Sequence, residues 1–180
     1  MAAPSRRAIR RLSPQRALKD IERIERLGPA TDRRRLLPPG AAPAGRLHAA
    51  VYRFGEPIAL SERVPVLENL GFRAIDERSY HLKPRFADEV VDVTLHDMVL
   101  ERADGEPIEL AGHDSRLEGC FLAVLRGEAD NDGFNRLILS AGADWRGACA
   151  VRAYCAYLRQ LGSPFRVALS CRYLAPARRP

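Results

Sequence analysis

The residues best suited to chemistry gather in one acidic stretch, residues 126–136, which reads Arg-Gly-Glu-Ala-Asp-Asn-Asp-Gly-Phe-Asn-Arg. Glu128, Asp130 and Asp132 alternate along it and a glycine follows, which is the spacing of the first half of a calcium-binding loop. Such a loop begins with aspartate and needs a bidentate glutamate at its twelfth position, where this chain has Leu139. The pattern therefore does not predict a calcium site.

A structural role explains the same stretch better. It lies between two apolar runs of helical character, 117–125 and 137–141. Asp130 and Asn131 have side chains that cap helices, a helix is expected to begin near Gly133, and the arginine at either end can pair with an acid. We interpret the stretch as a hydrogen-bonded corner that sets the directions of helices. The residues assigned to this corner are Arg126, Glu128, Asp130, Asn131, Asp132 and Arg136.

The histidines offer no second site. His96 is followed by Asp97, but neighbouring side chains of a strand point to opposite faces, so adjacency does not make the two a catalytic dyad. A hydrogen-bonded histidine within a strand is the favoured interpretation. No pair of histidines has the spacing of a zinc site. The four are His48, His81, His96 and His113.

Nucleophilic and phosphate-binding motifs are missing from the sequence. Ser140 and Ser170 lack the pattern of a nucleophile elbow, and there is no glycine-rich phosphate loop. The cysteines form no Cys-x-x-Cys pair, and we expect reduced thiols that lie mostly in the core. They are Cys120, Cys149, Cys155 and Cys171. The sequence therefore assigns no catalytic, metal-binding or cofactor-binding residue.

Composition bounds the class of protein. The chain has 180 residues, 46% of them hydrophobic, which suits one domain or a small domain with a helical extension. The net charge of +6 is concentrated in residues 1–35, an arm that we interpret as a solvated face docking on an acidic neighbour. Nucleic-acid binding is a less favoured alternative, and the acid-free residues 1–18 also resemble a transit peptide. No apolar run reaches the ~18 residues that span a membrane, so we expect a cytoplasmic protein without membrane contact.

The first third of the chain predicts one helix and a linker. Ser13-Pro14 is a favourable helix start, and Gly28-Pro29 is a stop. Between them an apolar stripe recurs at helical spacing. Its members are Ala17, Leu18, Ile21, Ile24 and Leu27. Residues 36–46 hold several prolines and glycines and predict an irregular linker.

The middle of the chain predicts a sheet. Alternating or apolar strands are expected at 47–54, 72–82 and 90–100. A helix at 62–70, capped by Ser61, lies between the first two strands, and a helix at 115–126 follows the third. The order β-α-β-β-α predicts an α+β, ferredoxin-like fold, an antiparallel sheet with helices on one face.

The last third predicts helices. One is expected from Asn135 to Ala141 with its stop at Gly142, and Asp144 is expected to cap another at 145–161. The second of these is apolar on so many sides that it needs partners to bury it, and the chain supplies few.

An RNA-recognition fold is an alternative for such a sheet. That fold displays aromatic side chains on its central strands. The strands here offer Tyr52, Phe54, Phe72 and Tyr80, but the Lys/Arg-Gly-Phe/Tyr-Gly/Ala-Phe motif is missing.

Several stretches together point to a known family. They are residues 13–25 (Ser-Pro-Gln-Arg-Ala-Leu-Lys-Asp-Ile-Glu-Arg-Ile-Glu), 66–78 (Val-Leu-Glu-Asn-Leu-Gly-Phe-Arg-Ala-Ile-Asp-Glu-Arg), His96-Asp97, 121–137, Asp144-Trp145-Arg146 and 158–165. In these stretches the chain resembles the large bacterial NAD-specific glutamate dehydrogenases. The resemblance covers roughly residues 13–165, and its most distinctive part is the corner described above.

The resemblance implies an enzyme much larger than this chain. The full enzyme oxidatively deaminates L-glutamate to 2-oxoglutarate and ammonia, with NAD as hydride acceptor. This chain resembles its last ACT-like regulatory unit and the helices that lead towards its catalytic domain. We therefore expect a regulatory and scaffolding segment that is inactive alone and binds no cofactor itself. The implied partners are the remainder of the enzyme chain, its homo-oligomer and an amino-acid effector.

Four regions are expected. A basic segment with one helix and a Pro/Gly-rich linker occupies residues 1–45, an ACT-like unit 46–114, a helical motif 115–165, and a tail that departs from the family 166–180. A truncated or frame-shifted reading frame, or an excised fragment, would account for the tail.

An effector has one candidate position. In ACT-type modules the glycine turn after the first strand lets a ligand approach the start of the next helix. That turn is Gly55-Glu56 here, leading to Ser61, and a plain connection between strand and helix is the alternative. A free-standing amino-acid-binding module is correspondingly the alternative to a role within the enzyme.

Overall fold

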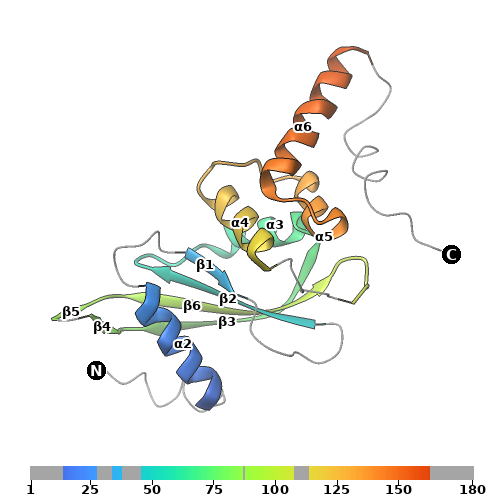
Figure 1. Ribbon diagram of the computed structural model, residues 1–180. Coiled ribbons are helices and arrows are strands. Elements are labelled where there is room, and N and C mark those ends of the chain that lie inside the picture. Colours follow the sequence, from blue (N-terminus) through green and yellow to red (C-terminus); the bar gives the residue numbers. More distant parts are fainter. Residues whose placement is uncertain (1–13, 28–33, 38–45, 87, 108–113, 163–180) are drawn as a thin grey trace.

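The structure, a computed structural model, describes residues 14–27, 34–37, 46–86, 88–107 and 114–162. Within these residues an antiparallel sheet is followed by a group of helices, so the expected α+β class is confirmed (Figure 1). The elements in chain order are α2 (Pro14–Leu27), β1 (Arg34–Leu37), β2 (Arg46–Phe54), α3 (Leu60–Asn69), β3 (Phe72–Leu82), β4 (Arg85–Phe86), β5 (Glu89–Val90), β6 (Val93–Arg102), α4 (Asp114–Leu125), the 3-10 helix η1 (Gly133–Arg136), α5 (Leu137–Ala141) and α6 (Trp145–Gln160).

The main sheet has the strand order β1-β2-β6-β3, with all neighbours antiparallel. β2 and β6 form its centre and pair over their whole length, from Arg46 opposite Glu101 to Phe54 opposite Val93. β3 pairs with the other side of β6, and its register shifts between Ala74 and Asp76. β4 and β5 form a separate two-stranded hairpin beyond one end of the sheet (Figure 1).

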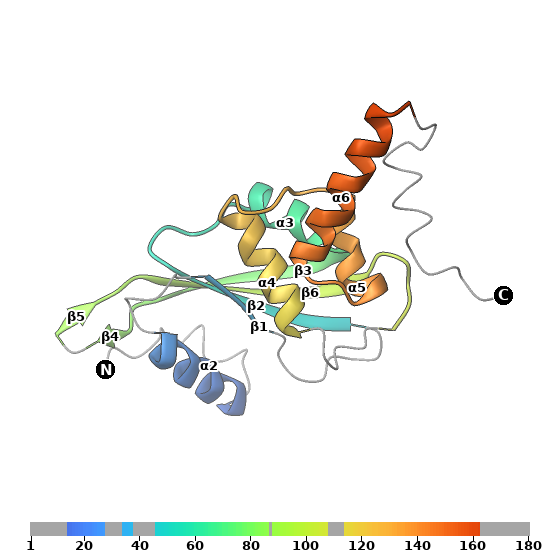
Figure 2. The same ribbon diagram turned by 45° about the horizontal axis from the view of Figure 1, so that its top comes forward.

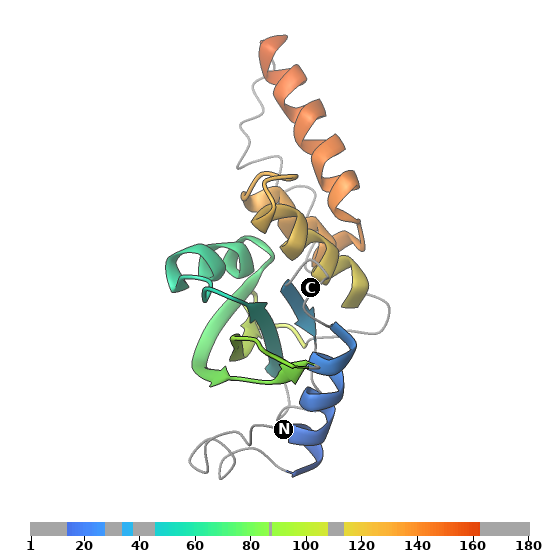
Figure 3. The ribbon, with the colours of Figure 1, turned by 90° about the vertical axis from the view of Figure 1, so that its left-hand side faces the viewer.

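Both faces of the central strands are buried. α3 and α4 cover one face, where their side chains pack against the core residues Ala49, Val51, Met98 and Leu100. α2 lies on the opposite face (Figures 2 and 3), where Ile24 joins a second core cluster. That cluster also contains Ala50, Tyr52, Phe54, Val93 and Leu95. Covering helices were expected on one face only, and α2 adds a second layer.

The edge strand β1 corrects the expectation of an irregular linker over 36–46. Leu36 and Leu37 belong to β1 and pair with Val51 and Ala50 of β2. In the ferredoxin-like order the place beside the first long strand goes to a strand that follows the second helix. Here a strand that precedes the sheet occupies that place, and the chain after α4 continues into further helices. Residues 38–45 of the expected linker lie outside the described residues.

α2 is the expected helix, and among its described side chains Ile24 is the one member of the expected stripe that is buried. Leu18 is 61% exposed and Ile21 is 41% exposed, whereas Asp20 and Ile24 face the sheet. The Tyr52 hydroxyl donates a hydrogen bond to Asp20 Oδ1 at 2.6 Å. Burial, followed by the neighbouring Asp20 carboxylate, raises the pKa of Tyr52. Among the described side chains of α2, the Asp20 contact and the apolar side chain of Ile24 therefore hold the helix on the sheet.

α3 begins at Leu60, two residues earlier than the proposed Ser61 cap allows. Its N-cap is Ala59, so Ser61 lies inside the helix and does not cap it. The helix ends at Asn69, and Gly71, which follows its C-cap Leu70, has φ 97° and donates its amide to Glu68 O, as expected for a glycine stop. A left-handed backbone of this kind favours glycine, because other residues there meet a Cβ clash.

The third predicted strand is displaced. β6 runs from Val93 to Arg102, and Glu89–Val90 belongs to the hairpin strand β5. The Asp104-Gly105 turn follows as predicted, with the Gly105 amide donating to Arg102 O at 3.1 Å. Tyr52, Phe54 and Phe72 are buried in the two cores, so they do not form the exposed aromatic platform of an RNA-recognition fold.

A buried polar cluster ties α3 to the sheet. The Arg63 guanidinium donates hydrogen bonds to Ile58 O and to the Glu77 carboxylate. Ser79 Oγ lies 2.8 Å from His96 Nδ1 and 3.2 Å from Glu77 Oε1. His96 of β6 is therefore a hydrogen-bonded strand histidine, as predicted, with its partner Ser79 on the neighbouring strand β3. Asp97 points to the other face, where its Oδ1 lies 3.7 Å from a nitrogen of His48.

Burial of His96 makes the fold sensitive to acid. His96 is 2% exposed, and burial, together with the charge of Arg63, lowers its pKa from 6.5 to about 4, although Glu77 acts in the opposite direction. Below pH 6.5 the unfolded chain binds a proton that the folded chain does not. The contribution of the neutral ring to stability is therefore complete above pH 6.5 and is lost as the pH falls towards 4.

We predict that His96 alone removes roughly 2 kcal/mol of unfolding free energy between about pH 7.5 and about pH 5. Urea unfolding at the two pH values measures this loss. The variant His96→Gln keeps a polar side chain without a titrating group and should lose less stability over the same interval than the wild type. His81→Gln, on the exposed edge strand, is the matched control. Equal losses in the wild type and His96→Gln would contradict the prediction.

Candidate functional site

The corner begins where α4 ends. The amides of Arg126, Gly127 and Glu128 donate to carbonyls of the last turn of α4, and Gly127 has φ 74°. These bonds satisfy the free carbonyls of the helix end and turn the chain away from the axis of α4. The predicted position between two helices is confirmed, since η1 and α5 follow on the other side.

Asp132, and not Asp130 or Asn131, caps the helical segment that follows. Its Oδ1 accepts a hydrogen bond from the Phe134 amide at 3.0 Å. Asp130 contributes its backbone carbonyl, which accepts from Asn135 Nδ2 at 3.0 Å. Asn131 Oδ1 instead accepts from Asn69 Nδ2 at 3.0 Å and so joins the corner to the end of α3. The corner is therefore held from inside and also fastened to the sheet-covering layer.

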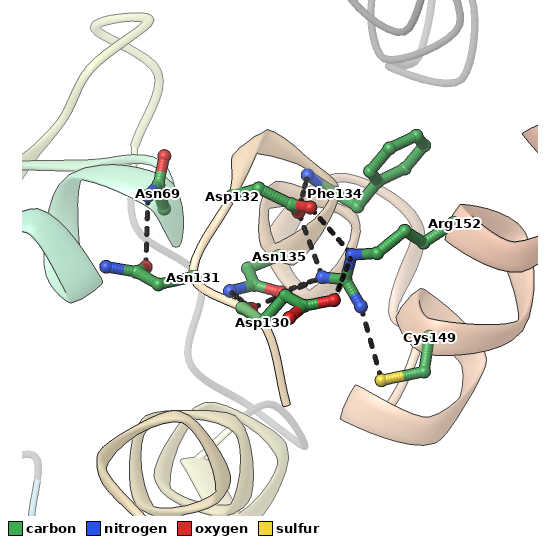
Figure 4. A network of polar contacts seen from close by, with 8 residues as sticks. All are labelled: Asn69, Asp130, Asn131, Asp132, Phe134, Asn135, Cys149 and Arg152. Atoms are coloured by element: carbon green, nitrogen blue, oxygen red, sulfur yellow. Dashed lines mark hydrogen bonds and ion pairs between the residues drawn. The ribbon is translucent and has the colours of Figure 1, made fainter. Parts of the chain in front are cut away.

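The residue that organises the corner is Arg152 of α6, which the sequence did not single out (Figure 4). Its Nε donates to Asp132 Oδ2 at 2.6 Å and its Nη2 to Asp132 Oδ1 at 2.9 Å, a bidentate pair. Nη2 also donates to Asn135 Oδ1 at 3.0 Å and to Asp130 O at 3.3 Å. The Arg152 guanidinium thus contacts the capping residue Asp132, the side chain of Asn135 and the backbone carbonyl of Asp130.

The electrostatics of this contact are favourable. The Arg152 side chain is 16% exposed, and its hydrogen bonds to Asp132 outweigh partial burial and raise its pKa. The guanidinium also lies over the ring of Phe134, at 5.7 Å from the ring centroid. Bidentate arginine–carboxylate pairs are among the stronger polar contacts in proteins. We conclude that Arg152 fixes the direction in which α6 leaves the corner.

The arginines proposed for the corner have smaller roles. Arg126 lies 4.0 Å from Glu128 at an exposed position. Arg136 is exposed, and its aliphatic part covers Gly71, where an added Cβ would come within 3.2 Å of Arg136 Cγ. No sequence signal distinguishes Arg152 from the many other arginines, because its partners lie 17–22 residues earlier.

α6 starts as predicted. Asp144 Oδ1 accepts from the Gly147 amide at 2.7 Å, which is a standard N-cap. α5 ends at Gly142, where φ is 64° and the left-handed conformation favours glycine. Because the Gly142 stop and the Asp144 cap are close together in the sequence, the connection between α5 and α6 is short.

A shallow pocket of about 350 Å³ lies between the corner and α6. Cys149 lies on its wall, with its Sγ 3.3 Å from Arg152 Nη1. Cys120 is fully buried nearby in α4, and burial raises the pKa of its thiol to about 12. The pocket is lined by Gly127, Glu128, Ala129, Asp130, Cys149, Arg152, Ala153 and Ala156.

The contacts of the corner hold helices together. Arg152 and Asp132 neutralise each other, and the amides of Gly127, Glu128 and Phe134 donate hydrogen bonds within the corner and to α4. Among the described residues no group of three or more His, Cys, Asp or Glu side chains is placed to hold a metal ion. Cys120, Cys149 and Cys155 are free thiols, and Cys171 and His113 lie outside the described residues.

The candidate effector position is an open turn. Gly55 has φ 81°, its amide donates to Asp92 O at 2.9 Å, and a Cβ there would meet nothing within 4 Å. Glu56 is exposed, and its carbonyl accepts from Arg53 Nε at 3.0 Å. Ser61 is also exposed. The space beside the turn is consistent with an approaching ligand, and effector binding remains a prediction.

Fold and corner together define a class: an ACT-like α+β domain joined to a compact helical motif. Comparison with known protein families identifies which family has this combination. Residues 33–113 match the ACT3 domain of glutamate dehydrogenase, and residues 129–176 match helical motif 3 of glutamate dehydrogenase. The chain belongs to the glutamate dehydrogenase family. The first match begins before β1, in agreement with the place of this strand in the sheet. The second extends beyond Phe165, where the sequence analysis placed the start of a divergent tail.

Curated relatives agree with this assignment. The chain is 35% identical over 132 residues to an NAD-specific glutamate dehydrogenase of Pseudomonas aeruginosa, covering 73% of this chain and 8% of the relative. It is 38% identical over 125 residues to that of Halomonas elongata, covering 69% and 7%. The match to the Mycobacterium tuberculosis protein of the same name is 27% over 116 residues, covering 62% and 7%. The chain thus spans less than a tenth of the length of these relatives.

We predict that Arg152→Ala lowers the unfolding free energy by roughly 1–3 kcal/mol, since it leaves the half-exposed Asp132 carboxylate without its bidentate partner. Arg152→Lys should restore part of the loss, because it keeps the charge without the fork geometry. Urea unfolding measures both.

Arg159→Ala is the control for this series. Arg159 lies on the exposed end of the same helix, and its removal should change stability by no more than about 0.5 kcal/mol. Equal stability of Arg152→Ala and Arg159→Ala would show that the corner does not depend on the guanidinium.

Proposed function

We propose that this chain is a regulatory and scaffolding segment of an NAD-dependent glutamate dehydrogenase and is inactive alone. The enzyme as a whole converts L-glutamate and NAD to 2-oxoglutarate, ammonia and NADH. The observation that carries the proposal is the pair of family matches, an ACT3 domain followed by helical motif 3, in a chain that spans less than a tenth of its relatives. The partners on this proposal are the remainder of the enzyme chain and its homo-oligomer.

The geometry supports a scaffolding role. Arg152 and Asp132 hold α6 in a fixed direction, and Asn131 links the same corner to α3 above the sheet. A domain built in this way can set the relative placement of a sheet and a helix that leads elsewhere. In the described residues no helix is long and apolar enough to cross a membrane.

The first test is turnover. We expect no glutamate-dependent formation of NADH when the purified chain is incubated with L-glutamate and NAD and followed by absorbance. A full-length NAD-specific glutamate dehydrogenase in the same buffer is the control for substrate and cofactor. Sustained NADH formation by this chain, proportional to its concentration, would overturn the proposal.

The regulatory part has a separate test at Gly55. We expect one or more amino acids to raise the melting temperature of the wild type and to release or absorb heat in calorimetry. Gly55→Ala places a side chain in the open turn and should abolish the shift. Gly105→Ala is the matched control, since Gly105 has φ 77° and is equally open but belongs to another turn. If none of the amino acids tested changes the melting temperature of the wild type, the prediction of an effector site at this turn is wrong.

A further inference from the structure

α3 connects the candidate effector turn to the corner. The turn at Gly55 leads into the helix, which begins at Leu60 and ends at Asn69, a length of 10 residues. A helix of that length spans about 15 Å. The side chains of Val66 and Leu67 are buried in the main core, so α3 is packed on the sheet along its length. One packed element therefore lies between the turn and the corner.

A buried arginine ties the first turn of α3 to the segment before it. Arg63 is 5% exposed, and its guanidinium donates hydrogen bonds to Ile58 O and to the Glu77 carboxylate of β3. Ile58 lies between the Gly55 turn and the helix, and its own side chain is buried in the main core. A change of backbone conformation at the turn therefore acts on Ile58 and, through the guanidinium, on the start of α3.

The other end of α3 contacts the corner through a side-chain hydrogen bond and through close packing (Figure 4). Asn69 Nδ2 donates to Asn131 Oδ1 at 3.0 Å. Gly71 follows the helix, and a Cβ added there would come within 3.2 Å of Arg136 Cγ and 3.6 Å of Leu139 Cδ1. Because this space is filled, the end of α3 cannot advance towards η1 and α5 without displacing them.

Asn131 lies between the two corner residues that bind Arg152. Asp130 O accepts a hydrogen bond from the guanidinium at 3.3 Å, and the Asp132 carboxylate accepts two more, at 2.6 Å and 2.9 Å. Both residues are bonded to Asn131 in the chain, so a shift of Asn131 moves them together. Arg152, and α6 with it, then has to follow.

We propose that α3 couples the Gly55 turn to the direction of α6. Arg63 takes up a change at one end of the helix, and Asn69 passes it to the corner at the other. A ligand that alters the turn then changes the direction in which α6 leaves the domain. This inference rests on the proposed regulatory function for the nature of the ligand, an amino acid. The coupling itself depends on contacts within the chain, so it can be tested without a ligand.

The chain carries its own reporter of α6. Trp145 is the single tryptophan of the sequence and the first residue of α6. Its ring lies beside Gly119 of α4, where an added Cβ would be 3.6 Å from Trp145 Cδ1, and the Arg146 guanidinium lies 4.3 Å from the ring centroid. A movement of α6 against α4 changes these surroundings. We therefore expect it to shift the fluorescence emission of Trp145.

The first experiment uses the full chain without a ligand. Gly55→Ala strains the turn, because Gly55 has φ 81°, and should shift the emission of Trp145. The shift should disappear when Asn69→Ala, which removes the bond to the corner, is added. Glu68→Ala truncates an exposed neighbour on α3 and should leave the shift in place. Gly162→Ala, at φ 75° in an open turn beyond the far end of α6, should give no shift.

Urea unfolding gives a second measurement of the same coupling. Substitutions at well-separated sites normally have additive effects on stability. Asn69→Ala should relieve part of the strain that Gly55→Ala introduces. The unfolding equilibrium constant of the double variant should therefore lie at least about threefold below the value that the two single variants predict together. Gly55→Asn is a milder second variant, because asparagine tolerates a positive φ better than alanine.

The second experiment adds the standard L-amino acids one at a time. An amino acid that binds the wild type in calorimetry should also shift the emission of Trp145. In Asn69→Ala the same amino acid should still bind, but the emission should no longer shift. If none of the amino acids binds, the proposed regulatory function fails, whereas the ligand-free variants still decide whether α3 couples the turn to α6.

The coupling is rejected by any of four results. Gly55→Ala leaves the emission of Trp145 unchanged, or its shift persists in full when Asn69→Ala is added. The effects of the two substitutions on the unfolding equilibrium constant are additive. An amino acid binds at the turn, as shown by loss of binding in Gly55→Ala, and the emission of Trp145 does not change.

Discussion

Burial of the central strands on both faces is the constraint on which the rest of the structure depends. Val51 and Tyr52 are consecutive in β2, point to opposite faces, and are both fully buried. A sheet with such strands needs a cover on each side. α3 and α4 supply one, and α2 supplies the other by bringing Asp20 against the Tyr52 hydroxyl. The basic N-terminal part of the chain is therefore part of the fold where it forms α2, and not only a charged arm.

The fold could be predicted largely from the sequence because its main signals are local. The apolar runs of β2 and β6, the Asp144 cap, and the stops at Gly71 and Gly142 act within a few residues of their own position. The order of elements then follows from the order of these signals. The family resemblance agreed with it, and the matches to ACT3 and helical motif 3 confirm the assignment.

The parts that could not be predicted depend on distant contacts. β1 has four residues, and Leu36 is a strand residue only because β2 offers it a partner at Val51. The apolar stripe of α2 predicted that Leu18 faces the sheet. The side of α2 that faces the sheet instead carries Asp20, because Asp20 accepts a hydrogen bond from Tyr52. At the corner the sequence identified the acids and missed Arg152, because an arginine some twenty residues away carries no mark of its partners.

The origin of the edge strand has a mechanical consequence. β1, which precedes the other strands in the sequence, occupies the edge position beside β2. Within the described residues the segment after α4 therefore adds no strand to the main sheet and continues as helices. A displacement of α6 reaches the sheet through the Arg152 corner, the Asn131–Asn69 bond and the packed helices, without pulling on a strand pairing. A force applied to α6 would therefore act on packed helices and side-chain contacts before it strained the hydrogen bonds of the sheet.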